Sequence, residues 1–235
     1  MSSFKSRFSN EHTLLAVVHV EGGVQAFRNT KIAQEEGADG VFLINHSIPY
    51  PSLIEVYLMI RQKMPDFWIG LNCLDLGRHA LDYIPKDTDG LWVDDAGINE
   101  ISKGLERAFS LEEARKFSEE RQKSNWNGIY FGGVAFKYQN QVVNARAAAN
   151  VASTFMDVVT TSGKGTGQAA ELDKIRDMSM GINNCALAIA SGITPENVRS
   201  YKPYADCFLV ATGISDSHTE LNPAKVRSLV KALKG

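Results

Sequence analysis

Short runs of apolar residues alternate with longer segments of mixed character, and this alternation repeats eight times along the chain. Apolar runs of about four to eight residues are typical of buried parallel strands, and mixed segments between them are typical of crossover helices. The predicted strands are residues 14–19, 40–45, 67–72, 90–94, 128–133, 155–160, 186–190 and 207–211.

Several of the intervening segments carry helix signals. One places its apolar residues on a single helical face, namely Leu53, Val56, Tyr57, Ile60 and Met64. Ser110 begins a capping-box pattern before a helix that runs toward Arg121, Thr194 with Pro195 predicts another helix start, and Asn222 with Pro223 predicts the last one. Strands and helices alternating in 235 residues predict an α/β fold, a single (β/α)8 TIM barrel spanning residues 1–235.

Two stretches fall outside this alternation. Residues 1–12 form a polar N-terminal segment before the first strand. Residues 95–110 separate the fourth strand from its helix by more than most loops of this kind. A lid over the barrel mouth and an inert surface excursion both fit this longer segment. A dinucleotide-binding sheet is disfavoured, because no GxGxxG motif follows the first strand.

Composition and charge limit the classes of partner that we expect for the protein. The net charge is −2, and lysine and arginine are scattered, so nucleic acid is not an expected partner. The apolar run at residues 14–18 is far too short to span a membrane, so we expect no membrane span and a cytoplasmic protein. Three cysteines without CxxC spacing are typical of buried, reduced thiols. A homo-oligomer is compatible with the sequence, which does not fix the oligomeric state.

Polar residues follow the predicted strands at the end where barrel enzymes keep their sites. We expect four of them to face the reacting part of a substrate: His19, Asn72, Asp94 and Lys137. Asp94 and Asp95 are adjacent, so they point to opposite faces of a strand and only one can serve as a general base.

The same mouth has room for a divalent metal. Histidines and carboxylates after the first strands, including the His19–Glu21 pair and His46, have the chemistry that zinc, manganese or iron prefers. No cofactor is evident from a motif, however, and the spacing does not assign a set of metal ligands. Hydrogen-bonded residues that orient a substrate are the alternative.

Glycine-rich turns after the last three strands predict a phosphate cradle. Glycine lets backbone N–H groups approach an anion, and barrels commonly hold phosphate after strands seven and eight. The predicted phosphate- and substrate-binding residues are Asn45, Ser162, Gly163, Lys164, Ser191, Gly192, Thr194, Thr212 and Gly213. A flexible glycine loop without a ligand remains the alternative for residues 160–167.

Residues 156–163 also resemble, loosely, the diphosphate-ribose signature of phosphoribosyltransferases. Met156 stands where the first acid of that signature is expected, and the glycine pattern is shifted. A phosphoribosyltransferase-like activity is therefore an alternative function.

Several segments together resemble the BtpA family of barrel proteins, which includes SgcQ-type proteins. The resemblance lies in residues 15–19, 45–51, 70–74, 158–167, 172–175, 191–198, 205–212 and 222–227. Residues 92–95 and 131–137 depart from the family pattern, with only Lys137 retained in the second, so the chain resembles a divergent branch. The resemblance implies a TIM barrel; one family member is linked to photosystem I biogenesis, and no general reaction is established.

The residues predict a barrel that binds a small phosphorylated metabolite, either a phosphosugar or a phosphoribosyl compound. As an enzyme, it would be an isomerase, lyase or transferase that uses acid/base chemistry. The family's photosynthetic link implies a different class of function, a non-catalytic assembly or stability factor, and the sequence does not decide between them.

Overall fold

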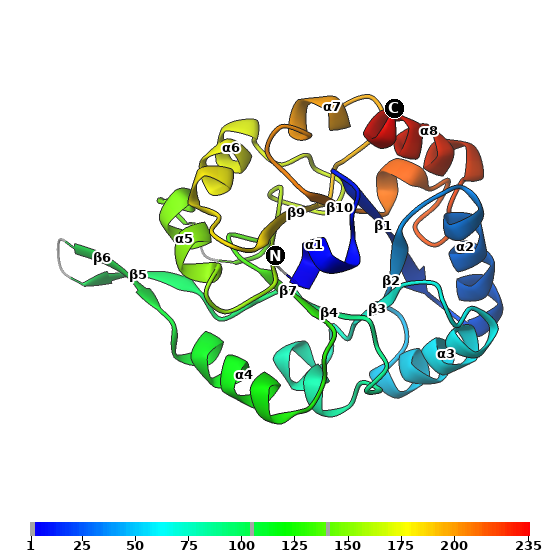
Figure 1. The fold of residues 1–235 in the computed structure, drawn as a ribbon, viewed down its shortest axis with the longest axis horizontal. Helices are drawn as coiled ribbons and strands as arrows, with labels where there is room; N and C mark the ends of the chain where they lie inside the picture. The colour runs from blue at the N-terminus through cyan, green and yellow to red at the C-terminus, as the bar shows by residue number, and fades with distance from the viewer. Residues whose placement is uncertain (1–2, 104–105, 140–141) are drawn as a thin grey trace.

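Eight parallel strands close into a barrel, which confirms the predicted α/β fold (Figure 1). The computed structural model describes residues 3–103, 106–139 and 142–235. Around the barrel the order is β1-β10-β9-β8-β7-β4-β3-β2, so neighbours along the chain are also neighbours in space. The strands are β1 (Thr13–Val20), β2 (Gly40–Asn45), β3 (Ile69–Asn72), β4 (Gly90–Val93), β7 (Ile129–Gly133), β8 (Val158–Ser162), β9 (Ala186–Ala190) and β10 (Cys207–Val210).

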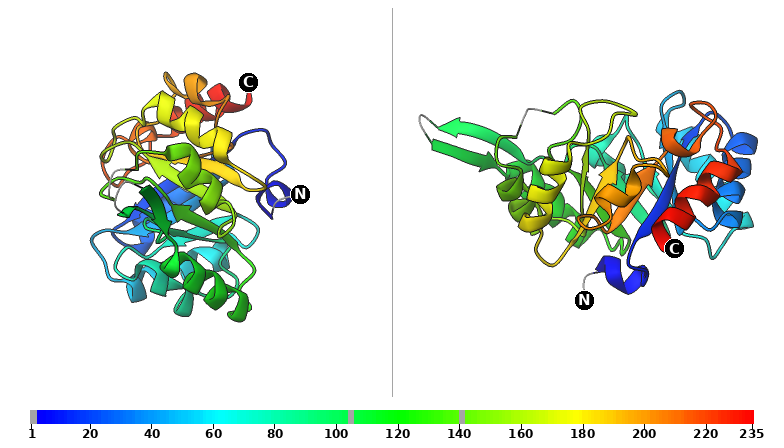
Figure 2. Two further views of the ribbon diagram at one scale, coloured as in Figure 1. Left: turned by 90° about the vertical axis from the view of Figure 1, so that its left-hand side faces the viewer. Right: turned by 90° about the horizontal axis from the view of Figure 1, so that it is seen from above.

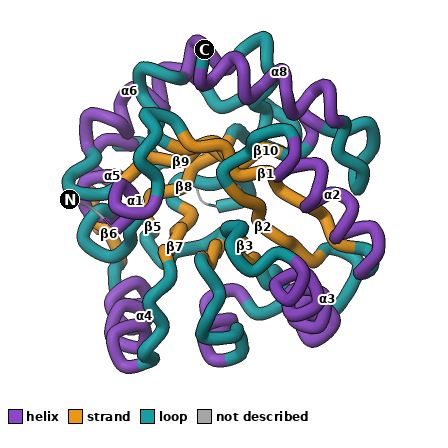
Figure 3. Tube along the Cα trace, turned by 45° about the vertical axis from the view of Figure 1, so that its right-hand side comes forward, coloured by secondary structure: helices purple, strands orange, loops and turns teal. Residues whose placement is uncertain are grey.

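Helices surround the ring of strands (Figure 3). They are α2 (Gly23–Glu35), α3 (Tyr50–Lys63), α4 (Glu112–Lys123), α5 (Ala145–Ala152), α6 (Leu172–Gly181), α7 (Val198–Tyr201) and α8 (Pro223–Lys234). Two 3-10 helices, η1 (Gly77–Asp82) and η2 (Thr212–Ile214), follow β3 and β10. In the part of the chain that the structure describes, no helix has the length and apolar character needed to cross a membrane.

Several predicted element boundaries are wrong. Residues 155–157 are not strand, because the N–H of Phe155 donates to the Ala152 carbonyl in the turn that ends α5. Ser110 caps no helix, since it ends a strand and pairs with Asn99. Thr194 precedes a turn rather than a helix, and α7 begins four residues later.

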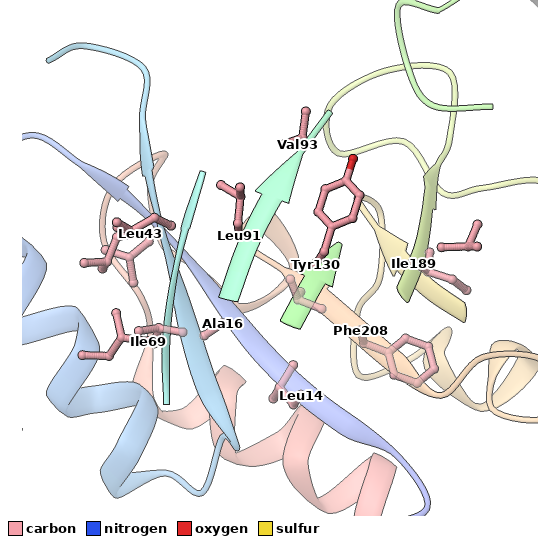
Figure 4. Packing of buried hydrophobic residues seen from close by; sticks show 14 of the residues in the cluster. Leu14, Ala16, Leu43, Ile69, Leu91, Val93, Tyr130, Ile189 and Phe208 are labelled. Atoms are coloured by element: carbon pink, nitrogen blue, oxygen red, sulfur yellow. The ribbon is translucent and has the colours of Figure 1, made fainter. Parts of the chain in front are cut away.

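Alternate residues of each strand face two different cores. One cluster fills the barrel interior and includes Leu15 and Val17 of β1. The other lies between barrel and helices and includes Leu14 and Ala16, which Figure 4 labels beside residues of the neighbouring strands. Because both faces of the barrel strands are buried, most of these strands read as apolar runs.

The polar N-terminal segment forms a short helix, α1 (Ser3–Arg7), across one opening of the barrel (Figure 1). Its Phe4 side chain is fully buried, and its ring lies 6.2 Å from that of Phe131 inside the barrel. Phe8 follows the helix and lies 5.5 Å from Trp68. This apolar plug closes the end of the barrel at which the strands begin, so the open end is the one where they finish.

The predicted lid segment forms an antiparallel hairpin of β5 (Asn99–Lys103) and β6 (Glu106–Ser110). The hairpin projects away from the barrel body (Figure 2). Near its base, Glu100 accepts a 2.6 Å hydrogen bond from the N–H of Val143, in the segment that leads to α5. A lid function for this hairpin stays a prediction.

Candidate functional site

A cavity of about 310 Å³ opens at the carboxyl ends of the strands. It is lined by the last inward-facing residues of several strands and by the loops after β7, β8, β9 and β10. Its polar lining residues are His19, His46, Asp94, Lys137, Tyr138, Thr166, Ser191 and Thr212. Its floor is apolar and includes Val17, Ile44 and Trp92.

Alternate residues of a strand point to the same side, and this alternation directs polar side chains at the strand ends into the cavity. His19 follows Leu15 and Val17 of the interior core, and Asp94 follows Trp92 in the same way. Of the two adjacent aspartates, Asp94 is the one that lines this cavity. Asp95 is exposed, accepts a 2.8 Å hydrogen bond from the N–H of Gly97, and pairs with Arg78.

Three histidines meet at one side of the cavity. The ring of His19 lies 4.1 Å from that of His218 and 4.7 Å from that of His46, centre to centre. His19 is only 9% exposed, whereas the other two are exposed. Burial and, to a smaller extent, the neighbouring His218, His46 and Lys137 together lower the pKa of His19 to about 3. His19 is therefore a neutral imidazole at physiological pH.

Residues on α2 hold His218 in place. His218 belongs to the 215–221 loop, which is closed by a bridge between Ser215 and Leu221. The side-chain amide of Gln25 donates to the His19 carbonyl at 3.1 Å and to the Thr219 carbonyl at 2.6 Å. Gln25 thus connects the end of β1 directly to the residue beside His218.

Asn72 supports Asp94. The amide of Asn72, at the end of β3, donates a 2.9 Å hydrogen bond to Oδ1 of Asp94. Burial raises the pKa of Asp94, while the Asn72 hydrogen bond and the positive charge of Lys137 offset part of that rise. A carboxyl in a cavity whose pKa is raised is a candidate for giving and taking protons.

Lys137 brings positive charge to the cavity from the loop after β7. Its N–H donates to the Ser162 hydroxyl at 2.8 Å, and its Nζ lies 3.4 Å from the Thr166 hydroxyl. Lys174 of α6 steadies the same region by donating to the carbonyls of Ala135 and Ser162. The loops after β7 and β8 therefore pack as one unit and present the Lys137 ammonium group to the cavity.

Asn45 joins two loops by hydrogen bonds within the protein. Its amide donates to Oδ1 of Asp75 at 2.8 Å and to the Ile48 carbonyl at 3.0 Å, and its carbonyl accepts from the N–H of Leu74 at 2.7 Å. The side chain joins the loops after β2 and β3, which fixes the backbone just before His46. Its polar atoms are thus occupied by the protein itself.

The structure divides the predicted phosphate cradle among separate places. Ser191 and Thr212 line the histidine cavity. Ser162, Gly163 and Lys164 line an adjoining cavity of about 450 Å³, where Lys164 pairs with Glu171. Thr194 and Gly213 line a shallow hollow beside α8, which Thr212 also touches. Lys137 lines both the histidine cavity and the adjoining one.

The predicted cradle glycines allow the loops to pack closely against one another. A Cβ atom on Gly213 would collide with the Ile193 carbonyl oxygen, and one on Gly192 would collide with the Ala169 backbone. Gly192 also has a φ of +70°, which favours glycine. The glycines therefore shape the cavity wall whatever ligand it holds.

Sequence reasoning missed His218 as a residue of the site and noted Thr166 only as part of the 160–167 loop. His218 gave no signal, because it comes eight residues after the end of β10 and reaches the site only through the folded 215–221 loop. Glu21, by contrast, lies outside the histidine group although it is only two residues from His19. The two-residue period of β2 would have indicated that His46 faces inward after Phe42 and Ile44.

Comparison with solved structures finds barrels of the same fold. The structure of (S)-3-O-geranylgeranylglyceryl phosphate synthase from Thermoplasma acidophilum, in complex with its substrate sn-glycerol-1-phosphate, matches 100% of this chain and 99% of its own, with 15% identity and a TM-score of 0.68. Phosphoribosyl anthranilate isomerase from Thermus thermophilus matches 94% of this chain and 98% of its own, with 13% identity and a TM-score of 0.63. No family model and no curated protein matches the sequence, so the resemblance to the BtpA family stays a prediction. At these identities, what the chain demonstrably shares with its structural neighbours is the TIM-barrel fold.

Proposed function

We propose that this barrel is an enzyme that binds a small phosphorylated metabolite in the cavity at the carboxyl ends of its strands. The observation that carries the proposal is that a partly buried carboxyl with a raised pKa, Asp94, and an ammonium group, Lys137, share one cavity of about 310 Å³. A cavity of that size suits a small metabolite.

The phosphate group would lie on the side formed by Lys137, Thr166, Ser191 and Thr212. This side offers one positive charge and three hydroxyl groups, all of which bind phosphate oxygens well. Structural neighbours support the assignment, since one of them was solved with sn-glycerol-1-phosphate. This position replaces the wider cradle that the glycine pattern predicted.

Asp94 would act as the general acid and base on the part of the substrate away from the phosphate. Its raised pKa and its fixed position beside Asn72 fit proton transfer at carbon or oxygen. The reaction class is accordingly that of an isomerase, lyase or transferase. We further propose a cytoplasmic protein, able to form homo-oligomers, from a divergent branch of the BtpA family.

The phosphoribosyltransferase alternative has little support in the closed barrel. Its signature belongs to an open sheet, and Asp157, the acid of the matching segment, comes just before β8 and so lies at the closed end of the barrel. There it accepts hydrogen bonds from the N–H of Tyr130 at 2.8 Å and from the Ser3 hydroxyl. An assembly factor would need no proton-transfer group in a cavity, so the presence of Asp94 in the cavity favours the enzyme.

The proposal is tested by measuring binding of inorganic phosphate, glycerol phosphate and ribose 5-phosphate by calorimetry. Lys137→Met should weaken binding of the best ligand by about 10- to 100-fold, because a charge-assisted hydrogen bond is lost. Lys164→Met is the matched control, since Lys164 is 75% exposed and faces Glu171 in the adjoining cavity. Equal losses in both variants, or no binding of any phosphorylated compound, would contradict the proposal.

A further inference from the structure

Three of the five histidines of the chain converge at the edge of the cavity, although they come from distant parts of the sequence. His19 is the second-last residue of β1, His46 follows β2, and His218 lies in the 215–221 loop. One ring nitrogen from each lies within 4.8 Å of the corresponding nitrogens of the other two. Nothing in the proposed phosphate site requires this arrangement.

We propose that His19, His46 and His218 bind one divalent transition-metal ion, with zinc as the preferred metal, and leave an open coordination position toward the cavity. Neutral imidazole is a common ligand of zinc, and three protein ligands with one open position are typical of catalytic zinc sites. The inference does not depend on the phosphorylated ligand.

The spacing of the three rings fits a metal with small adjustments. Zinc–nitrogen bonds of about 2.0–2.1 Å in a tetrahedral site place the ligand nitrogens about 3.3 Å apart and the ring centres about 5 Å apart. The ring centres here are 4.1, 4.7 and 5.5 Å apart. His46 and His218 are exposed, so their side chains can rotate toward His19 without disturbing the core.

The buried histidine has an unused nitrogen. Nδ1 of His19 is buried and has no hydrogen-bond partner among the residues that the structure describes. Buried polar atoms in proteins are nearly always paired, and an exception calls for an explanation. A metal ion at the histidine group is such an explanation, because the neutral ring carries a lone pair that a cation would satisfy.

Hydrogen bonds fix the backbone that carries the three histidines. Gln25 ties the backbone of His19 to the loop that carries His218, and Asn45 fixes the backbone before His46. Asn29 adds a further tie, since its amide donates to the Thr219 carbonyl at 2.7 Å. Groups that orient metal ligands commonly contribute 10- to 100-fold to metal affinity.

The open coordination position would face the ligand cavity. Both His19 and His46 line that cavity, and no carboxylate or cysteine joins the three histidines in the described ranges 3–103, 106–139 and 142–235. A metal held there would have room for water or for an oxygen atom of a bound ligand, and it would polarise that oxygen.

The test measures metal binding directly and needs no substrate. The purified full-length protein is stripped with a chelator, and its affinity for zinc is measured by competition with a chromogenic chelator. Cobalt is then added in place of zinc, and the visible absorption of the cobalt ion reports the coordination geometry. We expect one ion per chain and a tetrahedral cobalt spectrum.

Substitution identifies the ligands. His218→Ala and His46→Ala should each weaken zinc binding by at least tenfold and change the cobalt spectrum, while far-UV circular dichroism stays unchanged because both side chains are exposed. His79→Ala is the matched control, an exposed histidine on η1 outside the group, and should bind zinc like the wild type. Fewer than one ion per chain, or wild-type affinity in His218→Ala, would overturn the proposal.

Discussion

The side-chain amide of Asn72 donates a 2.9 Å hydrogen bond to Oδ1 of Asp94, across the adjacent strands β3 and β4. The amide favours the ionised form of the carboxyl, and burial disfavours it. The net result is a raised pKa, so burial is the larger of the two effects.

Relative to the wild-type protein, the Asp94→Asn variant should become more stable as the pH rises. Because the pKa of Asp94 is higher in the folded state, the folded protein binds more protons than the unfolded chain between the two pKa values. The contribution of Asp94 to wild-type stability is therefore fully present below the pKa that it has in the unfolded chain. It is lost as the pH rises through the pKa that it has in the folded protein. Urea unfolding of both proteins from pH 3 to pH 8 measures this contribution. A difference in their free energies of unfolding that does not change with pH would contradict the raised pKa.

Asn72→Leu should raise the pKa of Asp94 further, because it removes the hydrogen bond to the ionised form and adds apolar surface. A hydrogen bond to a charged group is worth about 1.5–3 kcal/mol, which corresponds to about one to two pKa units. Carbon-13 NMR titration of the Asp94 carboxyl measures the change, with Asp94→Asn used for the assignment. A pKa that stays the same or falls would show that the hydrogen bond does not stabilise the carboxylate.

Gly213→Ala should destabilise the protein and distort the cavity wall. The added Cβ collides with a backbone carbonyl, that of Ile193, which has no free rotamer to adopt, so we expect a loss of about 1–3 kcal/mol. Gly165→Ala is the matched control in a neighbouring loop. There the nearest atoms belong to the flexible end of the Gln168 side chain at 3.3 Å, and the loss should be small. Equal unfolding midpoints in urea for the two variants would refute the packing role.

Phe4→Ala should cost about 3–5 kcal/mol of stability and leave ligand affinity unchanged. The ring is fully buried in the plug at the closed end of the barrel, so its removal leaves a cavity far from the carboxyl ends of the strands. Val24→Ala, at a side chain that is 81% exposed, serves as the control. Urea unfolding and phosphate calorimetry together separate the two effects, and a loss of affinity in folded Phe4→Ala would show that the two ends are coupled.

Gln25→Ala should loosen the 215–221 loop without unfolding the barrel. The two hydrogen bonds to the carbonyls of His19 and Thr219 would be lost, so His218 would no longer be held beside His19. Zinc affinity should fall by about tenfold, and the cobalt spectrum should change. A cobalt spectrum identical to that of the wild type would show that Gln25 does not position the ligands.

The barrel could be predicted from the sequence because its strands are buried on both faces. The apolar runs at residues 40–45 and 186–190 coincide with β2 and β9, and Asn222 caps α8 as predicted, accepting from the N–H of Lys225 at 3.0 Å. Boundaries failed where apolar residues are buried by loop packing instead of strand pairing, as at Phe155.

The site was only partly predictable for a related reason. Some site residues, such as His19 and Asp94, continue the inward-facing alternation of a strand. These residues could be placed near the barrel mouth from sequence alone. His218 could not, because its position depends on hydrogen bonds between its loop and Gln25 and Asn29, about 190 residues away in sequence. The glycine turns also suggested one anion site, whereas contacts between loops separate their residues into different cavities.

Alternate side chains of β1 face inward, and this alternation limits how the barrel can evolve. Leu15 and Val17 fill the interior, and His19, the next inward-facing residue, lines the cavity. Deleting one residue within β1 would turn His19 outward and bring Val20 to the rim in its place. New chemistry can therefore arise here by exchanging side chains or lengthening loops, whereas insertions and deletions inside a strand erase the existing chemistry at once.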